Sequence, residues 1–219
     1  MKNLWIVGAG GFGRELFFWL KHSPENGVNW NIAGFVDDPL VEKGIKGNPI
    51  EKYLKTYNLK LKAFEDEKWT DKDIFVIGIG QPLLKEKVIN KMIKQGVQFL
   101  TFMHPSAIIG EFVEIGYGSV ICPNCIITCD VNIGKFVTIN IGSTVGHDCK
   151  IGDFTVISGN CDITGNCKLG QKVFLGTHAN LNPGTIIEDG ATVGAGSFGI
   201  GKVKKEKVVL GVPARKWMI

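Results

Sequence analysis

The sequence predicts two structural classes in series: an α/β domain over residues 1–104 and an all-β parallel helix, or solenoid, over residues 105–219. Two patterns carry this prediction. In the second half a large aliphatic residue recurs every six positions, whereas in the first half short apolar runs alternate with amphipathic, helix-like segments. At 219 residues the chain is long enough for two small domains.

The six-residue period runs unbroken through the second half. Its aliphatic positions are Ile109, Ile115, Ile121, Ile127, Ile133, Ile139, Val145, Ile151, Ile157, Ile163, Leu169, Leu175, Leu181, Ile187 and Val193. A small residue lies two positions before each of them. Such a period fits a chain that turns a corner every six residues and closes a coil in about eighteen. A run of β-hairpins would instead show a period of two and loops of uneven length. We therefore expect a triangular solenoid with both series pointing inward.

The first half is typical of alternating strands and helices. Strands are expected over residues 4–7, 32–36, 74–79 and 97–102, and helices over residues 14–21 and 83–95, with a third helix beginning near Pro49. A nicotinamide dehydrogenase is disfavoured, because four strands fall short of the six-stranded sheet that holds a whole dinucleotide. A Rossmann-like βαβαβ unit of this size can still bind one nucleotide.

A glycine-rich turn joins the first strand to the first helix. It contains Gly8, Gly10, Gly11, Phe12 and Gly13. Backbone amides at such a helix start can hydrogen-bond a phosphate. Asp37 and Asp38 follow the second strand, where dinucleotide folds hold a ribose hydroxyl. The alternative interpretation is that the glycines only make a tight turn against the helix.

The histidines are the candidate general bases. Of the four, only His147 is followed directly by a carboxylate, that of Asp148. A carboxylate that holds the far nitrogen fixes the imidazole tautomer and raises its basicity. Neighbours in a strand point apart, so the pair can hydrogen-bond only at a corner of the coil. The alternative is a surface histidine beside a solvated aspartate. His104 and His178 are left without an assigned role.

Composition disfavours several classes of function. A net charge of +4 and an isoelectric point near 8.7 indicate a mild basic excess, so no nucleic-acid partner is expected. No apolar run is long enough to span a membrane, and Arg14 and Glu15 interrupt the apolar N-terminus. We therefore expect a cytoplasmic protein without a membrane partner.

The six cysteines do not indicate a metal site. Four fall in the small inward series, where a thiol behaves as a compact buried hydrophobe: Cys125, Cys149, Cys161 and Cys167. Side chains at different heights of a solenoid cannot meet at one ion. No metal is expected, and Cys122 and Cys129 are left as the two thiols free to be exposed.

The repeat resembles that of the hexapeptide acyltransferases, which implies a left-handed parallel β-helix. The order of the two domains resembles bacterial sugar O-acyltransferases of the sialic-acid type (NeuD-like) and nucleotide-sugar N-acetyltransferases (PglD-like), over essentially the whole chain. This resemblance implies a nucleotide-activated amino sugar on the front domain and acetyl-CoA as co-substrate on the solenoid. It also implies a homotrimer with CoA in the groove between two prisms.

The resemblance also implies roles for individual residues. His147 would be the catalytic base and Asp148 the acid that orients it. Substrate would contact Gly8, Gly10, Gly11, Phe12, Asp37, Asp38, Gly80 and Gln81. CoA would contact Val156, Gly165, Thr177, Gly194, Ala195, Pro213 and Arg215. Phe12 and Val156 stand where members of the family often have histidine.

One outer row of the solenoid is unusually apolar. Positions eighteen apart are Val120, Thr138, Val156 and Phe174, and Phe136 is expected directly below Phe154. Outward aromatic residues in neighbouring coils predict a subunit contact.

The predicted function is an acetyl-CoA-dependent N-acetyltransferase acting on the amino group of a nucleotide-linked amino (dideoxy) sugar, for surface polysaccharide or glycan biosynthesis. One alternative is an O-acetyltransferase acting on a sialic acid or related sugar with the same base. The other is a non-catalytic nucleotide-sugar-binding partner of a biosynthetic enzyme.

Overall fold

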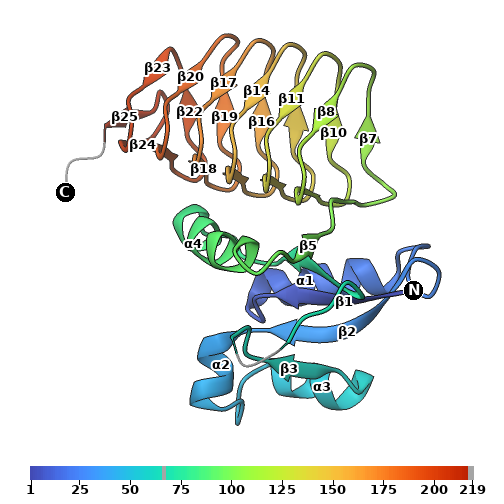
Figure 1. Cartoon of the computed structure of the whole chain (residues 1–219). Helices are drawn as coiled ribbons and strands as arrows, with labels where there is room; N and C mark the ends of the chain where they lie inside the picture. The colour runs from blue at the N-terminus through green and yellow to red at the C-terminus, as the bar shows by residue number, and fades with distance from the viewer. Residues whose placement is uncertain (66–67, 217–219) are drawn as a thin grey trace. The chain divides into compact units, whose positions relative to one another are not determined.

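The computed structural model describes residues 1–65 and 68–216, so the last three residues of the predicted solenoid domain lie outside the described residues. The chain divides into two compact units (Figure 1). Unit 1 comprises Met1–Gly80 and Leu84–Leu100, and unit 2 comprises Gln81–Leu83 and Thr101–Ile219. Within the described ranges, no helix has the length and apolar character needed to cross a membrane.

Unit 1 contains a five-stranded parallel sheet in the order β3-β2-β1-β4-β5. Its strands are β1 (Lys2–Val7), β2 (Trp30–Val36), β3 (Lys60–Lys62), β4 (Asp73–Ile77) and β5 (Gln98–Phe99). The sequence predicts four strands and misses β3, which has the sequence Lys-Leu-Lys and no apolar run. Lysines are common on exposed edge strands, where they discourage pairing with other chains. Five strands are still fewer than a full dinucleotide fold requires.

The helices of unit 1 follow the predicted alternation. They are α1 (Gly11–Lys21), α2 (Asp38–Lys43), α3 (Ile50–Tyr57) and α4 (Pro82–Ile93). The unpredicted α2 is only six residues long, and the Asp37 carboxylate caps it by accepting from the amide of Leu40. Helices α1 and α3 pack against each other, because the Phe17 ring lies 5.8 Å from that of Tyr53 and 5.1 Å from that of Tyr57.

Asp73, at the start of β4, has a buried carboxylate that connects β1 with the segment that precedes β4. It accepts hydrogen bonds from the Trp5 indole (2.9 Å), from the Asn3 amide (3.2 Å), and from the backbone and hydroxyl of Thr70. Burial alone would raise the pKa of Asp73, but these hydrogen bonds outweigh burial and hold the pKa below its usual value. The ionised carboxylate is therefore part of the folded structure at neutral pH.

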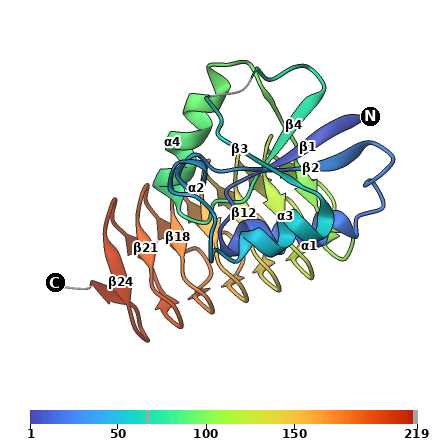
Figure 2. The same cartoon turned by 90° about the horizontal axis from the view of Figure 1, so that it is seen from below.

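Unit 2 is a triangular parallel β-helix with three sheets, whose coils stack along one axis in both views (Figures 1 and 2). Sheet I contains β6 (Phe102–Met103), β9 (Val120–Ile121), β12 (Thr138–Ile139), β15 (Val156–Ile157), β18 (Phe174–Leu175), β21 (Thr192–Val193), β24 (Val208–Leu210) and β25 (Arg215–Lys216). Sheet II contains β7 (Ile108–Ile109), β10 (Ile126–Ile127), β13 (Thr144–Val145), β16 (Asp162–Ile163), β19 (Asn180–Leu181) and β22 (Phe198–Gly199). Sheet III contains β8 (Glu114–Ile115), β11 (Asn132–Ile133), β14 (Lys150–Ile151), β17 (Lys168–Leu169), β20 (Ile186–Ile187) and β23 (Lys202–Val203).

The strand expected over residues 97–102 is in fact two strands. β5 pairs with β4 in the sheet of unit 1, whereas β6 pairs with β9 as the first rung of sheet I. Continuous apolar sequence cannot show this division, because both strands need the same residue types.

The core of unit 2 follows the six-residue period. Every aliphatic position from Ile121 to Val193 is at most 4% exposed, and the register pairs residues eighteen apart, as in Val145 with Ile163. Ile109 and Ile115 are only half-buried, because no coil lies beneath the first one. Hydroxyls in the small series are satisfied inside the prism; for example, Ser143 donates to the carbonyl of Ser158 at 2.9 Å.

Three of the four residues of the apolar outer row are buried in the single chain, and Phe174 is half-buried. Val120, Thr138 and Val156 are 1%, 2% and 4% exposed. The expected aromatic stack is present, since the rings of Phe136 and Phe154 lie 5.5 Å apart and 11° from parallel. The row therefore does not by itself call for a second subunit, and the homotrimer stays a prediction.

Candidate active site

His147 and Asp148 lie at a corner of the β-helix. The chain turns there from β13 in sheet II to β14 in sheet III, and Asp148 takes a left-handed backbone conformation with φ of 59°. This conformation brings neighbouring side chains together, which a regular strand would not do. The His147 Nδ1 atom lies 2.7 Å from the Asp148 Oδ2 atom. Asparagine and aspartate tolerate left-handed backbone better than most residues, so the acid also suits the turn.

The imidazole of His147 packs against Gly165, one coil along at the same corner. A Cβ atom at Gly165 would lie 2.5 Å from Nε2 and 2.6 Å from Cε1 of the ring, so only glycine leaves room for it. The amide of Asn166 donates to the His147 carbonyl at 2.8 Å and fixes the two coils together. Both side chains of the histidine–aspartate pair are 57% exposed.

This arrangement suits general base catalysis. Because Asp148 accepts a hydrogen bond from Nδ1–H, the lone pair of His147 is at Nε2. That nitrogen is the atom next to Gly165. The Gly165 amide makes no hydrogen bond to another described residue. An acceptor for a proton and a donor for a developing negative charge therefore adjoin at one corner.

The other predicted CoA residues lie elsewhere on unit 2. Thr177, Gly194 and Ala195 are exposed or half-buried at the corner where the chain turns from sheet I to sheet II. Val156 lies within β15 and its side chain is 4% exposed, so it is not brought to the His147 corner. Within one prism, the predicted CoA residues occupy different edges.

Pro213 and Arg215 lie at the C-terminal end of the β-helix. Arg215 is in β25, which pairs antiparallel with β24, and its exposed side chain makes no ion pair with another described residue. The amide of Ala214 donates to the carbonyl of Phe198 at 2.8 Å, which ties this segment to the last coil.

The glycines of the turn in unit 1 divide into two kinds. A Cβ atom at Gly13 would lie 1.9 Å from the Gly8 carbonyl oxygen, and Gly8 itself has φ of 94°, so these two glycines allow α1 to pack closely on β1. Gly10 and Gly11, by contrast, have nothing within 4 Å of a Cβ position. The first turn of α1 has no side-chain cap and no acidic residue. The tight-turn interpretation therefore holds for Gly8 and Gly13, whereas phosphate binding at Gly10 and Gly11 stays a prediction.

The two predicted aspartates have different environments. Asp37 lies beside the glycine turn and accepts a hydrogen bond from the Ala9 amide at 2.9 Å. Asp38 is held by the Phe64 amide at 2.6 Å and by the Lys91 ammonium group at 2.9 Å. Both carboxylates therefore make hydrogen bonds within the protein: Asp37 links the glycine turn to the start of α2, and Asp38 holds the segment before β4. A contact of either aspartate with a nucleotide stays a prediction.

The remaining predicted substrate residues follow β4. A Cβ atom at Gly78 would lie 2.8 Å from the Gly13 Cα atom, which shows how closely this strand end approaches the turn. Gly80 is exposed with open space around it, and Gln81 is exposed just before α4. Phe12 contacts the ring of Trp19 at 6.3 Å rather than offering a polar group.

The cysteines are mainly core residues. Cys122 is fully buried, contrary to the expectation that it is free to be exposed, and Cys129 is only half-buried. Burial raises the pKa of Cys125 and of Cys161 to about 11, so neither thiol is reactive at neutral pH. In the described part of the chain, no three His, Cys, Asp or Glu residues gather closely enough to hold a metal ion.

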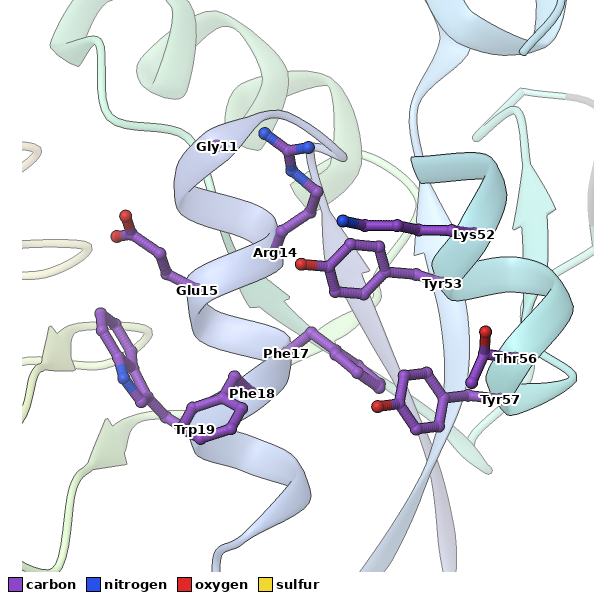
Figure 3. A pocket seen from close by; sticks show the side chains of 10 residues that line it. All are labelled: Gly11, Arg14, Glu15, Phe17, Phe18, Trp19, Lys52, Tyr53, Thr56 and Tyr57. Carbon is purple, nitrogen blue, oxygen red and sulfur yellow. The ribbon is translucent and has the colours of Figure 1, made fainter. Parts of the chain in front are cut away.

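Sequence reasoning missed a cleft between α1 and α3. It has a volume of about 650 Å³ and is lined by residues of these two helices, among them Arg14 and Lys52 (Figure 3). Arg14 figures in the sequence only as an interruption of an apolar segment. Arg14 and Lys52 come from different helices, so the sequence alone could not show that both line one cleft.

The sequence of this chain resembles known proteins in both units. The family described as the PglD N-terminal domain matches residues 3–92. The GDP-perosamine N-acetyltransferase of Escherichia coli O157:H7 is 31% identical over 181 residues, covering 82% of this chain and 77% of that protein.

Solved structures match the whole chain. WeeI from Acinetobacter baumannii AYE superposes with a TM-score of 0.84 at 29% identity, covering 99% of this chain and 100% of that one. PerB from Caulobacter crescentus, in complex with CoA and GDP-perosamine, superposes with a TM-score of 0.78 at 24% identity, covering 100% and 98%. The matches confirm the predicted fold class, an α/β domain followed by a left-handed parallel β-helix.

Proposed function

The chain belongs to the PglD-like family of hexapeptide-repeat nucleotide-sugar acetyltransferases, and from this premise we propose that it transfers acetyl from acetyl-CoA to the amino group of a nucleotide-linked amino sugar. The observation that carries the proposal is the His147 corner, where Nδ1 is held by Asp148 and Nε2 lies against Gly165. The similarity of this chain to a GDP-perosamine N-acetyltransferase favours a nitrogen atom over an oxygen atom as the nucleophile of the acceptor sugar.

In the proposed reaction, the amine nitrogen of the sugar attacks the thioester carbon of acetyl-CoA. His147 Nε2 accepts a proton from the amine nitrogen during this attack. A carbon–nitrogen bond forms, the carbon–sulfur bond breaks, and the proton passes from the imidazolium to the CoA thiolate. The products are the N-acetylated sugar nucleotide and CoA with a free thiol. A general base of this kind contributes roughly 10²–10⁴ in rate.

Two further groups at the corner support this chemistry. The Asp148 carboxylate, 2.7 Å from Nδ1, stabilises the imidazolium that forms when Nε2 takes the proton. The Gly165 amide is proposed as the donor to the thioester oxygen, which becomes negative in the tetrahedral intermediate. Glycine suits position 165 in this proposal, because the absence of a side chain leaves space both for the His147 ring and for the acetyl group.

The separation of the predicted CoA residues supports an assembly of more than one chain, as in the predicted homotrimer. His147 and Gly165 lie at the corner between sheets II and III, whereas Thr177, Gly194 and Ala195 lie at the corner between sheets I and II. A single prism cannot bring two of its edges to one ligand, but two adjoining prisms can face these edges across a groove. We therefore propose that CoA binds between subunits. A sedimentation experiment that finds a monomer at micromolar concentration would refute this arrangement.

The nucleotide is assigned to unit 1. Gly10 and Gly11 leave the first-turn amides of α1 accessible, and Asp37 lies beside them. Both proposed substrates, acetyl-CoA and a nucleotide sugar, are products of cytoplasmic metabolism, so we place the reaction in the cytoplasm, as a step in glycan biosynthesis.

The decisive assay offers the protein acetyl-CoA together with a panel of GDP-, UDP- and dTDP-linked amino sugars and a sialic acid. Release of free CoA thiol, with a product heavier by one acetyl group, is expected with an amino sugar nucleotide. Acetylation of the sialic acid alone would favour the O-acetyltransferase. Binding of a nucleotide sugar without thiol release from any acceptor would support a non-catalytic partner and contradict the proposal.

A further inference from the structure

A recurring hydrogen bond lines the interior of the β-helix, in which an inward hydroxyl or thiol donates to a carbonyl fifteen residues further along the chain. Ser143 donates to the carbonyl of Ser158 in this way at 2.9 Å, and Cys149 donates to the carbonyl of Thr164 at 3.1 Å. Each bond gives a partner to a carbonyl that faces the interior. At Cys149 the bond has a second consequence, because the residue after Thr164 is Gly165.

The Thr164 carbonyl and the Gly165 amide belong to one peptide unit. This peptide is trans and planar, so its C=O and N–H groups point in opposite directions. The Cys149 side chain is fully buried inside the prism, and the carbonyl that it binds is therefore directed inward. The Gly165 N–H group is consequently directed outward, to the side of the corner where the acetyl group is proposed to lie.

The Cys149 thiol is the donor that holds this carbonyl. No other described residue donates to the Thr164 oxygen, from its backbone or from its side chain. A hydrogen bond with Cys167 and burial raise the pKa of Cys149, so the thiol keeps its proton and remains a donor at neutral pH. Removing the thiol would leave both polar groups of this peptide unit without a hydrogen bond inside the described chain.

The neighbouring coils lack this combination at the same corner. One coil earlier, the position of Cys149 is occupied by Val131, whose side chain has no donor. One coil later, Cys167 donates to the Asn182 carbonyl at 3.4 Å, but the next residue is Pro183, which has no N–H group. Of these coils, the one that contains Cys149 alone joins a thiol donor to a peptide that carries an N–H group.

We propose that Cys149 is a positioning residue of the active site. Its thiol holds the Thr164 carbonyl inside the prism, and this keeps the Gly165 N–H group directed at the thioester oxygen of acetyl-CoA. We rest this inference on the proposed function, because the Gly165 amide is the oxyanion donor of that reaction. Removal of an oxyanion donor costs roughly 10²–10³ in kcat, so a donor that is kept but no longer held should cost less, about tenfold.

The kinetic test measures CoA thiol release by Cys149 variants under saturating substrates. Cys149→Ala removes the donor and should lower kcat about tenfold, while KM for acetyl-CoA changes by less than about twofold. Cys149→Ser should keep kcat within about threefold of the wild type, because the Ser143 hydroxyl makes the same bond from the preceding inward position. Cys149→Val also lacks a donor but fills the space, as Val131 does one coil earlier, so it should match Cys149→Ala and replaces it if the alanine variant does not fold.

The matched control is Cys167→Ala, at the same corner one coil later. It removes a fully buried thiol and its hydrogen bond to a carbonyl, as Cys149→Ala does, but the peptide that it releases carries no N–H group. Both alanine variants should lower the midpoint of thermal unfolding by similar amounts, whereas kcat of Cys167→Ala should stay within about twofold of the wild type. Equal losses of kcat in the two variants would show that Cys149 serves core packing alone, and would overturn the proposal.

Infrared spectroscopy of bound acetyl-CoA, labelled with ¹³C at the thioester carbonyl, reports the hydrogen bond from Gly165 without any acceptor sugar. A hydrogen bond to the oxygen weakens the C=O bond, so the stretching frequency should be lower on the wild type and on Cys149→Ser than on Cys149→Ala and Cys149→Val. Equal frequencies on all four proteins would overturn the role of Cys149 and leave the transferase standing. A wild type that does not bind acetyl-CoA would instead overturn the proposed function, and this inference with it.

Discussion

Substituting Gly165 with alanine tests the catalytic corner while His147 and Asp148 keep their identity. The added Cβ atom would lie 2.5 Å from His147 Nε2, whereas ordinary contact begins near 3.4 Å. The imidazole must therefore retreat by about 0.9 Å from its position in the wild type. Gly165 is not in the left-handed region, so alanine adds no backbone strain, and it keeps the amide.

A displacement of this size should cost about 10² in kcat, since roughly 1 Å of misplacement has that effect at a reacting centre. The loss should not exceed that of His147→Ala, which removes the base altogether. The assay is CoA thiol release under saturating substrates. Thermal unfolding should change little, because the ring lies on the surface, 57% exposed, and can move without opening the core.

A double variant separates the ring from other effects of the alanine. If Gly165→Ala acts only by moving the imidazole, adding it to His147→Ala should leave the residual rate unchanged. Wild-type turnover by Gly165→Ala would refute the assignment of Nε2 as the proton acceptor. A further large loss in the double variant would show that the alanine blocks the acetyl group instead.

Three other substitutions test separate parts of the structure. Asp148→Asn suits the left-handed turn at φ 59° but removes the carboxylate, so kcat should fall about 10–100-fold in steady-state assays with KM little changed. Gly13→Ala would bring a Cβ atom 1.9 Å from the Gly8 oxygen; it should destabilise unit 1 by about 1–3 kcal/mol in urea unfolding and weaken nucleotide binding. Asp73, with its lowered pKa, contributes stability above about pH 4 that is lost as the pH falls further. Asp73→Asn should therefore be about 1–3 kcal/mol less stable at pH 7 and should lose less stability in acid; equal acid sensitivity of the two proteins would contradict this.

The solenoid could be predicted almost completely from the sequence. Its six-residue period is set by close packing inside each coil, and every inward position must obey the same constraint. Because one coil takes about eighteen residues, the same period also places Gly165 at the corner occupied by His147, one coil further along. It could not show that Val156 is buried, because an outward register position says nothing about what covers it.

Unit 1 was less predictable, because its elements are short and depend on contacts distant in sequence. Helix α2 depends on the cap from Asp37, and β3 on pairing with β2. The sequence could not distinguish Gly13, where a Cβ atom would clash with the Gly8 carbonyl oxygen, from Gly10, where a Cβ atom would meet nothing. Likewise, the neighbours of Arg14 in the cleft come from a helix nearly forty residues away.

The central claim, that an imidazole held by Asp148 is the base for acetyl transfer, is tested most directly by His147→Ala. With a nucleotide-linked amino sugar and acetyl-CoA both saturating, the rate of CoA thiol release should fall by roughly 10²–10⁴, while acetyl-CoA still binds with wild-type affinity. A variant that releases thiol at the wild-type rate would contradict the claim.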